Sequence, residues 1–159
     1  MKPAWLGRRF LLAAAALVLA LLGLLPALPV VAQDIHLTGL AGERLSDADL
    51  AQGTMIVVVW ASWSPRSHDI VERMQPLAGR WHAQAKVMTV DFEEDRKAVE
   101  AFLAGKTMNL AVFLDSDGAF SKKYAVATLP GLLVLKEGKT LYHGKLPEDP
   151  DRLLTTLIH

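Results

Sequence analysis

The sequence predicts an α/β domain in which helices flank a mixed β-sheet, and three observations support this. The β-branched run at residues 56–59 is too short and too apolar for a half-exposed strand, so it indicates a strand buried on both faces. A second strand pattern at residues 86–92 follows one helical pattern, which makes a parallel βαβ unit. Two extended runs on either side of residues 136–139 predict an antiparallel hairpin at the end of the sheet.

The N-terminal segment has the pattern of a secretory signal. Lys2, Arg8 and Arg9 precede an uninterrupted apolar stretch, and small residues at positions 30–32 fit a cleavage site. We therefore expect a signal peptide at residues 1–32, one domain at residues 33–159, and a periplasmic or secreted location. The alternative is an uncleaved anchor in the inner membrane with the domain facing the periplasm, because this apolar run is long enough to span a bilayer.

Charge and cysteine content narrow the functional classes. Removing residues 1–32 takes away three basic side chains and no acidic one, which leaves a formal charge of about −3 on the remainder of a chain that is neutral overall. No basic patch remains, so nucleic acid is not an expected partner. The chain has no cysteine. An exported protein lies where disulfides persist, so a reducing compartment does not explain this absence.

The predicted elements follow one another without a long linker. Residues 34–45 form two extended pieces around a glycine turn, and residues 46–50 form a capped helical turn that ends at Gly53. After the first buried strand, Ser64 and Pro65 start a helix, because the serine oxygen can cap it and proline suits its first position. This helix carries one apolar face: Ile70, Val71, Met74 and Leu77.

The second half of the chain adds two helices and a strand. Three acidic residues at positions 93–95 precede a helix with Val99, Phe102 and Leu103 on one face, and we expect them to act as favourable charges at its N-terminus. A strand at residues 110–114 and a polar turn follow. Residues 149–158 form a closing amphipathic helix.

Residues 60–67 read Trp-Ala-Ser-Trp-Ser-Pro-Arg-Ser at the predicted strand-to-helix turn. This segment resembles the Trp-Ala-Ser-Trp-Cys-Pro-x-Cys signature of the thioredoxin superfamily, in particular the periplasmic thioredoxin-like proteins of the cytochrome c maturation (TlpA) type. Ser64 and Ser67 occupy the two cysteine positions. The resemblance covers nearly all of residues 34–158. It implies a thioredoxin-like fold with an N-terminal β-hairpin and an inserted helix–strand unit.

The resemblance also implies where a partner binds. Leu129-Pro130 looks like the cis-proline segment of the family, which lies beside the active cysteines and offers its backbone to a bound peptide. Val58 stands where ordinary thioredoxins bury an acidic residue, so a buried acid is not expected here. Arg66 is either a solvated side chain or a recognition element for an acidic group. The implied partner-binding groove consists of Trp63, Ser64, Arg66, Ser67, Leu129 and Pro130.

The leading functional hypothesis is an exported, redox-inactive thioredoxin-like protein that binds a polypeptide partner, without a cofactor. Thiol–disulfide exchange requires a thiolate that attacks sulfur, which serine cannot provide. One alternative is an oxidoreductase whose cysteines were lost recently or by engineering. Another is a structural subunit held by an uncleaved N-terminal segment, and only then is the membrane a partner.

Two other chemistries are disfavoured by the sequence. A serine hydrolase would need His68 to take a proton from Ser64 with Asp69 as orienter, but adjacent helical residues point in different directions. No glycine-flanked nucleophile motif supports it. The histidines are scattered singly along the chain, so we expect no metal site.

Overall fold

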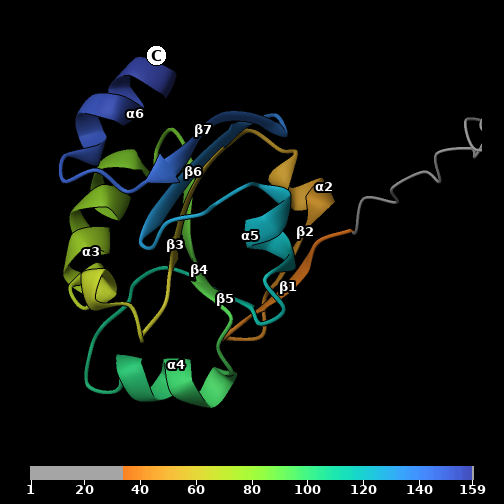
Figure 1. The fold of residues 1–159 in the computed structure, drawn as a ribbon. Helices are drawn as coiled ribbons and strands as arrows, with labels where there is room; N and C mark the ends of the chain where they lie inside the picture. Colours follow the sequence, from red (N-terminus) through yellow and green to blue (C-terminus); the bar gives the residue numbers. More distant parts are fainter. Residues whose placement is uncertain (1–33, 159) are drawn as a thin grey trace, which may run out of the picture. The chain divides into compact units, whose positions relative to one another are not determined.

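The computed structural model describes residues 34–158, so the predicted signal peptide or anchor lies outside the described residues. Seven strands form one sheet in the order β2-β1-β5-β4-β3-β6-β7 (Figure 1). The strands are β1 (His36–Gly39), β2 (Arg44–Ser46), β3 (Thr54–Trp60), β4 (Lys86–Phe92), β5 (Val112–Asp115), β6 (Gly131–Lys136) and β7 (Lys139–Lys145). The helices are α2 (Asp47–Leu50), the 3₁₀-helix η1 (Pro65–Ser67), α3 (Ile70–Trp81), α4 (Arg96–Leu103), α5 (Ala119–Lys123) and α6 (Pro150–Ile158).

The strand pairing confirms the predicted mixed sheet. Strand β4 runs parallel to β3 and β5, as the βαβ pattern requires. Strand β6 pairs antiparallel with β3 and with β7, which is the predicted C-terminal hairpin. Strands β1 and β2 form the N-terminal hairpin, and β1 joins the sheet by pairing antiparallel with β5. The inserted helix–strand unit, α4 and β5, therefore connects the leading hairpin to the central strands.

Helices cover both faces of the sheet, as predicted. Side chains of α3, α4 and α6 pack in one apolar cluster, while those of α2 and α5 pack in the other. Strand β3 contributes alternately to the two clusters: Val58 and Trp60 to the first, Val57 and Val59 to the second, all without solvent exposure. This explains why the run has no polar residue: the strand has no exposed face.

The motif segment differs from the expected single helix. Ser67 donates its N–H to Ser64 O at 2.9 Å, an i→i+3 bond that makes the short 3₁₀-helix η1, and α3 begins only at Ile70. Ser64 has the extended backbone of an N-cap, but its side chain makes no capping hydrogen bond. The prediction that the Ser64 oxygen caps the helix is therefore wrong.

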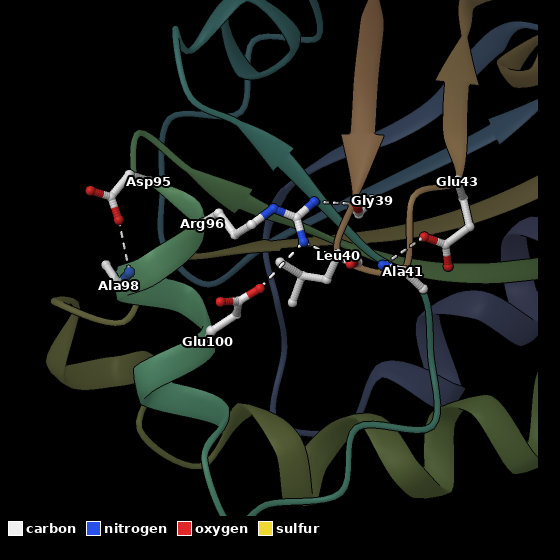
Figure 2. Close-up of polar contacts among 8 residues, drawn as sticks. All are labelled: Gly39, Leu40, Ala41, Glu43, Asp95, Arg96, Ala98 and Glu100. Carbon is white, nitrogen blue, oxygen red and sulfur yellow. Dashed lines mark hydrogen bonds and ion pairs between the residues drawn. The ribbon is translucent and has the colours of Figure 1, made fainter.

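Arg96 joins α4 to the N-terminal hairpin (Figure 2). Its guanidinium donates to Leu40 O at 2.7 Å and to Gly39 O at 2.9 Å, across more than fifty positions in sequence. At the same helix end, Asp95 accepts a capping hydrogen bond from Ala98 N at 2.8 Å. Of the three acids expected to favour this helix end, Asp95 fulfils that role directly.

Replacing Arg96 with alanine is expected to destabilise the fold by about 1 to 3 kcal/mol, because two carbonyl groups lose a charged donor. Chemical denaturation measures this change. The matched control is Lys97→Ala, which removes a neighbouring exposed cation that makes no contact of this kind in the described part of the chain. Equal stability of the two variants would show that the Arg96 contacts contribute nothing.

Candidate functional site

The motif lies where β3 leaves the sheet. Trp60 and Ala61 are buried, and the chain then turns so that Trp63 becomes 59% exposed. Ser64 N–H closes this turn by bonding Ala61 O at 3.1 Å. Ser64 is 5% exposed and Ser67 is fully buried, and the Ser67 Oγ has no hydrogen-bond partner among residues 34–158. The two serines are thus largely shielded, whereas the tryptophan between strand and helix projects into solvent.

A pocket of about 480 Å³ opens beside the motif. We call it the motif pocket, and its lining residues are Trp63, Ser64, Pro65, Arg66, Phe92, Val126, Ala127 and Leu129. Four of the six residues in the expected groove therefore line it. The other two, Ser67 and Pro130, are buried and do not line the pocket.

Four lining residues are not in the expected groove: Pro65, which belongs to the motif itself, and Phe92, Val126 and Ala127. Phe92 ends β4, the strand paired in parallel with β3, so its position follows from the rule that carboxyl ends of adjacent parallel strands meet at one edge. Val126 and Ala127 have no such signal. They belong to an irregular segment whose path is set by tertiary contacts.

The segment opposite the motif is fixed from several sides. The Leu129–Pro130 peptide bond is cis. Pro130 O accepts a hydrogen bond from Leu146 N at 3.0 Å. Gly131 allows the close packing here, since a Cβ at this position would lie 2.7 Å from Thr128 O and 2.5 Å from a Val126 methyl carbon. This packing holds Leu129 at the rim of the motif pocket.

Glu94 reaches from the start of the inserted unit to the motif turn. Its carboxylate accepts a hydrogen bond from Ser62 N at 2.5 Å and a second, short one from the Ser62 hydroxyl. Ser62 directly precedes Trp63, so these bonds fix the backbone from which the exposed tryptophan projects. From its place in the sequence, Glu94 is expected only to favour the N-terminus of a helix. Its actual partner lies 32 residues away.

A buried acid lies next to this contact. Asp91 is fully buried on β4, beside Trp60 in the strand register, and neither of its carboxyl oxygens has a hydrogen-bond donor in the described residues. Burial, a carboxyl–carboxyl contact with Glu94, and the charges of Glu94 and Asp115 raise the pKa of Asp91 to about 9. The acid that ordinary thioredoxins bury at the position of Val58 is absent from β3, and the buried acid of this chain lies on the neighbouring strand β4.

Asp115, at the end of β5, shows the opposite arrangement. It is also fully buried, but it accepts hydrogen bonds from Phe120 N and Ser121 N, both at 2.9 Å, and from the Ser121 hydroxyl at 2.7 Å. These three donors satisfy the carboxyl oxygens of Asp115 and fix the start of α5. Asp91 has no such donors in the described residues, and its raised pKa means that the carboxyl group is protonated at neutral pH.

Among residues 34–158, the motif does not bring a nucleophile and a base together. His68 is exposed and makes no hydrogen bond with Ser64 or Ser67 in the described part of the chain. Within residues 34–158, no three histidine, aspartate or glutamate side chains gather as metal ligands would. The arrangement instead presents an exposed aromatic ring and a half-buried leucine around an open pocket.

Comparison with known proteins agrees with this fold. Residues 30–143 match the model of the AhpC/TSA family. Sporulation thiol-disulfide oxidoreductase A of Bacillus subtilis (strain 168) is 28% identical over 116 residues, which cover 70% of this chain and 68% of that protein.

Two solved structures share the fold. The exposed lipoprotein thioredoxin of Streptococcus pneumoniae strain TIGR4 is 23% identical with a TM-score of 0.68, over 79% of this chain and 98% of that one. A thiol:disulfide interchange protein DsbE of Chlorobium tepidum, described as putative, is 22% identical with a TM-score of 0.67, over 80% and 92% of the two chains. Within residues 34–158, none of the helices has the length and apolar character needed to cross a bilayer. The chain belongs to the AhpC/TSA family of thioredoxin-like proteins, and its structural neighbours are thiol-disulfide oxidoreductases of the DsbE/TlpA type.

Proposed function

We propose that this protein is an exported, redox-inactive member of its family that binds a polypeptide segment in the motif pocket. The redox part rests on chemistry: both cysteine positions of the motif are serine and the chain has no other cysteine. A serine hydroxyl neither forms a disulfide nor ionises near neutral pH. Export rests on the signal pattern at residues 1–32 and on the pneumococcal relative, which is named an exposed lipoprotein.

The binding proposal rests on two features of the motif pocket: an exposed aromatic ring, and backbone groups that have no hydrogen-bond partner in the described residues. Trp63 is 59% exposed, the most exposed large apolar side chain of the described residues. Across the pocket, the backbone N–H and C=O of Leu129 make no hydrogen bond in the described part of the chain. An extended peptide can pair with that backbone as an added strand and pack its side chains against the indole.

Arg66 lies at the same rim and is exposed. No ion pair of Arg66 exists within the described residues. A free guanidinium is suited to a carboxylate of the bound polypeptide, which extends the proposal to an acidic group at this end of the pocket.

Trp63→Ala is expected to weaken binding of an unfolded polypeptide by about tenfold or more, because the ring is the main apolar contact surface of the pocket. The probe is fluorescent, reduced and carboxymethylated α-lactalbumin, and its affinity for the full-length chain is measured by anisotropy. Leu141→Ala is the matched control, since Leu141 is also an exposed large apolar residue but lies on the edge strand β7, outside the pocket.

The control variant should bind within about twofold of wild type. Arg66→Ala should weaken binding less than Trp63→Ala, with an effect that disappears at high salt. If Trp63→Ala binds as well as wild type while remaining folded, the motif pocket is not the binding site.

A further inference from the structure

A second pocket, of about 430 Å³, lies between α3 and the connection from β7 to α6. Its apolar lining comes from Met74, Leu77 and Leu146, which are buried, and from Pro76 and Pro150. Arg73 also lines the pocket, and its Nη2 donates to Pro147 O at 2.9 Å, which ties the connection to α3. This surface plays no part in the site described above.

The rim of this second pocket is acidic. Glu72, Glu148 and Asp149 line it with exposed carboxylates. In the described residues, Glu72 and Glu148 have no hydrogen bond or ion pair, and Asp149 accepts only from Arg152 N at 3.4 Å. The fourth acid, Asp151, is already engaged by Arg80 at 2.5 Å and by Trp81 Nε1 at 2.7 Å.

Arg73 is the one cationic side chain that lines this pocket, and its guanidinium is directed to a backbone carbonyl. Three carboxylates therefore surround an apolar floor with little compensating charge. We call this surface the acid-rimmed pocket.

One backbone hydrogen bond links the acid-rimmed pocket to the segment that lines the motif pocket. Leu146, which lines the acid-rimmed pocket, donates its N–H to Pro130 O, and Pro130 directly follows Leu129 at the motif pocket. On the other side, Arg66 in η1 lines the motif pocket, and Glu72 in the first turn of α3 lines the acid-rimmed pocket. The two pockets thus flank the cis-proline segment.

We propose that the acid-rimmed pocket binds a lysine- or arginine-bearing apolar stretch of the same polypeptide that occupies the motif pocket. The aliphatic stem of a basic side chain can lie on the apolar floor while its charge meets the carboxylates. This inference rests on the proposed function and specifies its partner: a segment that is basic at one end. A second copy of the domain is disfavoured, because residues 33–159 carry a net negative charge.

The test uses labelled ten-residue peptides of alanine, valine and threonine that carry a Lys-Leu-Lys or a Glu-Leu-Glu block at either end. Each is titrated into the full-length ¹⁵N-labelled chain in detergent. Amide shifts of Trp63 and Leu129 report on the motif pocket, and those of Leu77 and Glu148 report on the acid-rimmed pocket. The key variant is Glu72→Gln/Glu148→Gln/Asp149→Asn, in which the last change keeps a capping oxygen for Arg152 N.

The triple variant should bind the lysine peptide about tenfold more weakly than wild type, by the summed effect of three exposed charge contacts. The matched control neutralises three exposed carboxylates elsewhere, Asp34→Asn/Glu100→Gln/Glu137→Gln, and should stay within about twofold of wild type. Both sets of amides should shift with a lysine peptide, and the glutamate peptides should bind more weakly.

The other outcomes separate the two proposals. Shifts at Trp63 and Leu129 alone, with an unchanged affinity of the triple variant, overturn this inference and leave the proposed function standing. Shifts at Leu77 and Glu148 alone overturn the proposed function and this inference with it. Equal binding of lysine and glutamate peptides overturns recognition of a basic segment.

Discussion

Replacing Asp91 with asparagine is expected to stabilise the protein by at least about 2 kcal/mol at pH 7, although it alters a fully buried polar side chain. Burial and the neighbouring carboxyl groups raise the pKa of Asp91 from 3.8 to about 9. Between roughly pH 4 and pH 9 the folded protein therefore holds a proton that the unfolded chain has released. Asparagine has the same shape, can donate to Glu94, and does not ionise.

The sign of the pH dependence follows from this proton. Because the folded state binds more protons than the unfolded state, the Asp91 contribution to stability falls as pH rises through this window. The variant lacks that slope. Burial acts to raise the pKa of Asp47, but its contacts with Lys123 and Ile35 N outweigh burial and lower the pKa. The pKa of Asp49 is lowered by hydrogen bonds from Ser46. The stability that these two carboxylates contribute is therefore lost at acidic pH in the wild type and in the variant alike. The informative quantity is the difference between variant and wild type.

Urea denaturation at pH 4, 7 and 9 measures this difference. It should be near zero at pH 4 and increase toward pH 9. Asp115→Asn is the control, because that buried carboxylate already has three donors. Its loss should destabilise the fold by about 1 to 3 kcal/mol at pH 7. A difference for Asp91→Asn that stays constant across pH would contradict the proton assignment.

The second large expected effect is that the chain gains thiol–disulfide chemistry when Ser64 and Ser67 are both replaced by cysteine. The wild-type chain should not accelerate reduction of insulin by dithiothreitol, because it has no thiol. The double variant Ser64→Cys/Ser67→Cys should close a disulfide on mild oxidation. The bond from Ser67 N to Ser64 O places the two positions one 3₁₀ turn apart, which keeps their Cα atoms within about 7 Å, near the range a disulfide spans.

Mass spectrometry after alkylation counts the free thiols before and after oxidation. The matched control is Ser62→Cys/Ser67→Cys, which keeps the number of thiols but moves one of them to the residue that Glu94 holds. Disulfide formation in the first variant would indicate that the motif turn still has the geometry of an oxidoreductase. Its absence would favour a chain that diverged further from the reaction.

The local features of this protein follow from the sequence alone. The buried strand β3, the hairpins at both ends of the sheet, and the capped turn at Ser46 depend on residues close in sequence, so periodicity and turn chemistry predict them. The family resemblance of the motif placed Trp63 in the implied groove, and the structure shows it exposed at the motif pocket.

Other features depend on contacts that no local pattern records. The sequence places Glu94 at the N-terminus of a helix, but its carboxylate accepts hydrogen bonds from Ser62 at the motif. Asp91 is a polar residue near the end of a strand, yet it is fully buried beside Trp60. Ser64 reads as a helix cap, yet the chain forms a 3₁₀ turn there instead. For Glu94 and Asp91 the physical cause is the same: parallel strand order brings the ends of β3 and β4 together, and neighbours tens of residues away set the environment of a side chain at that edge.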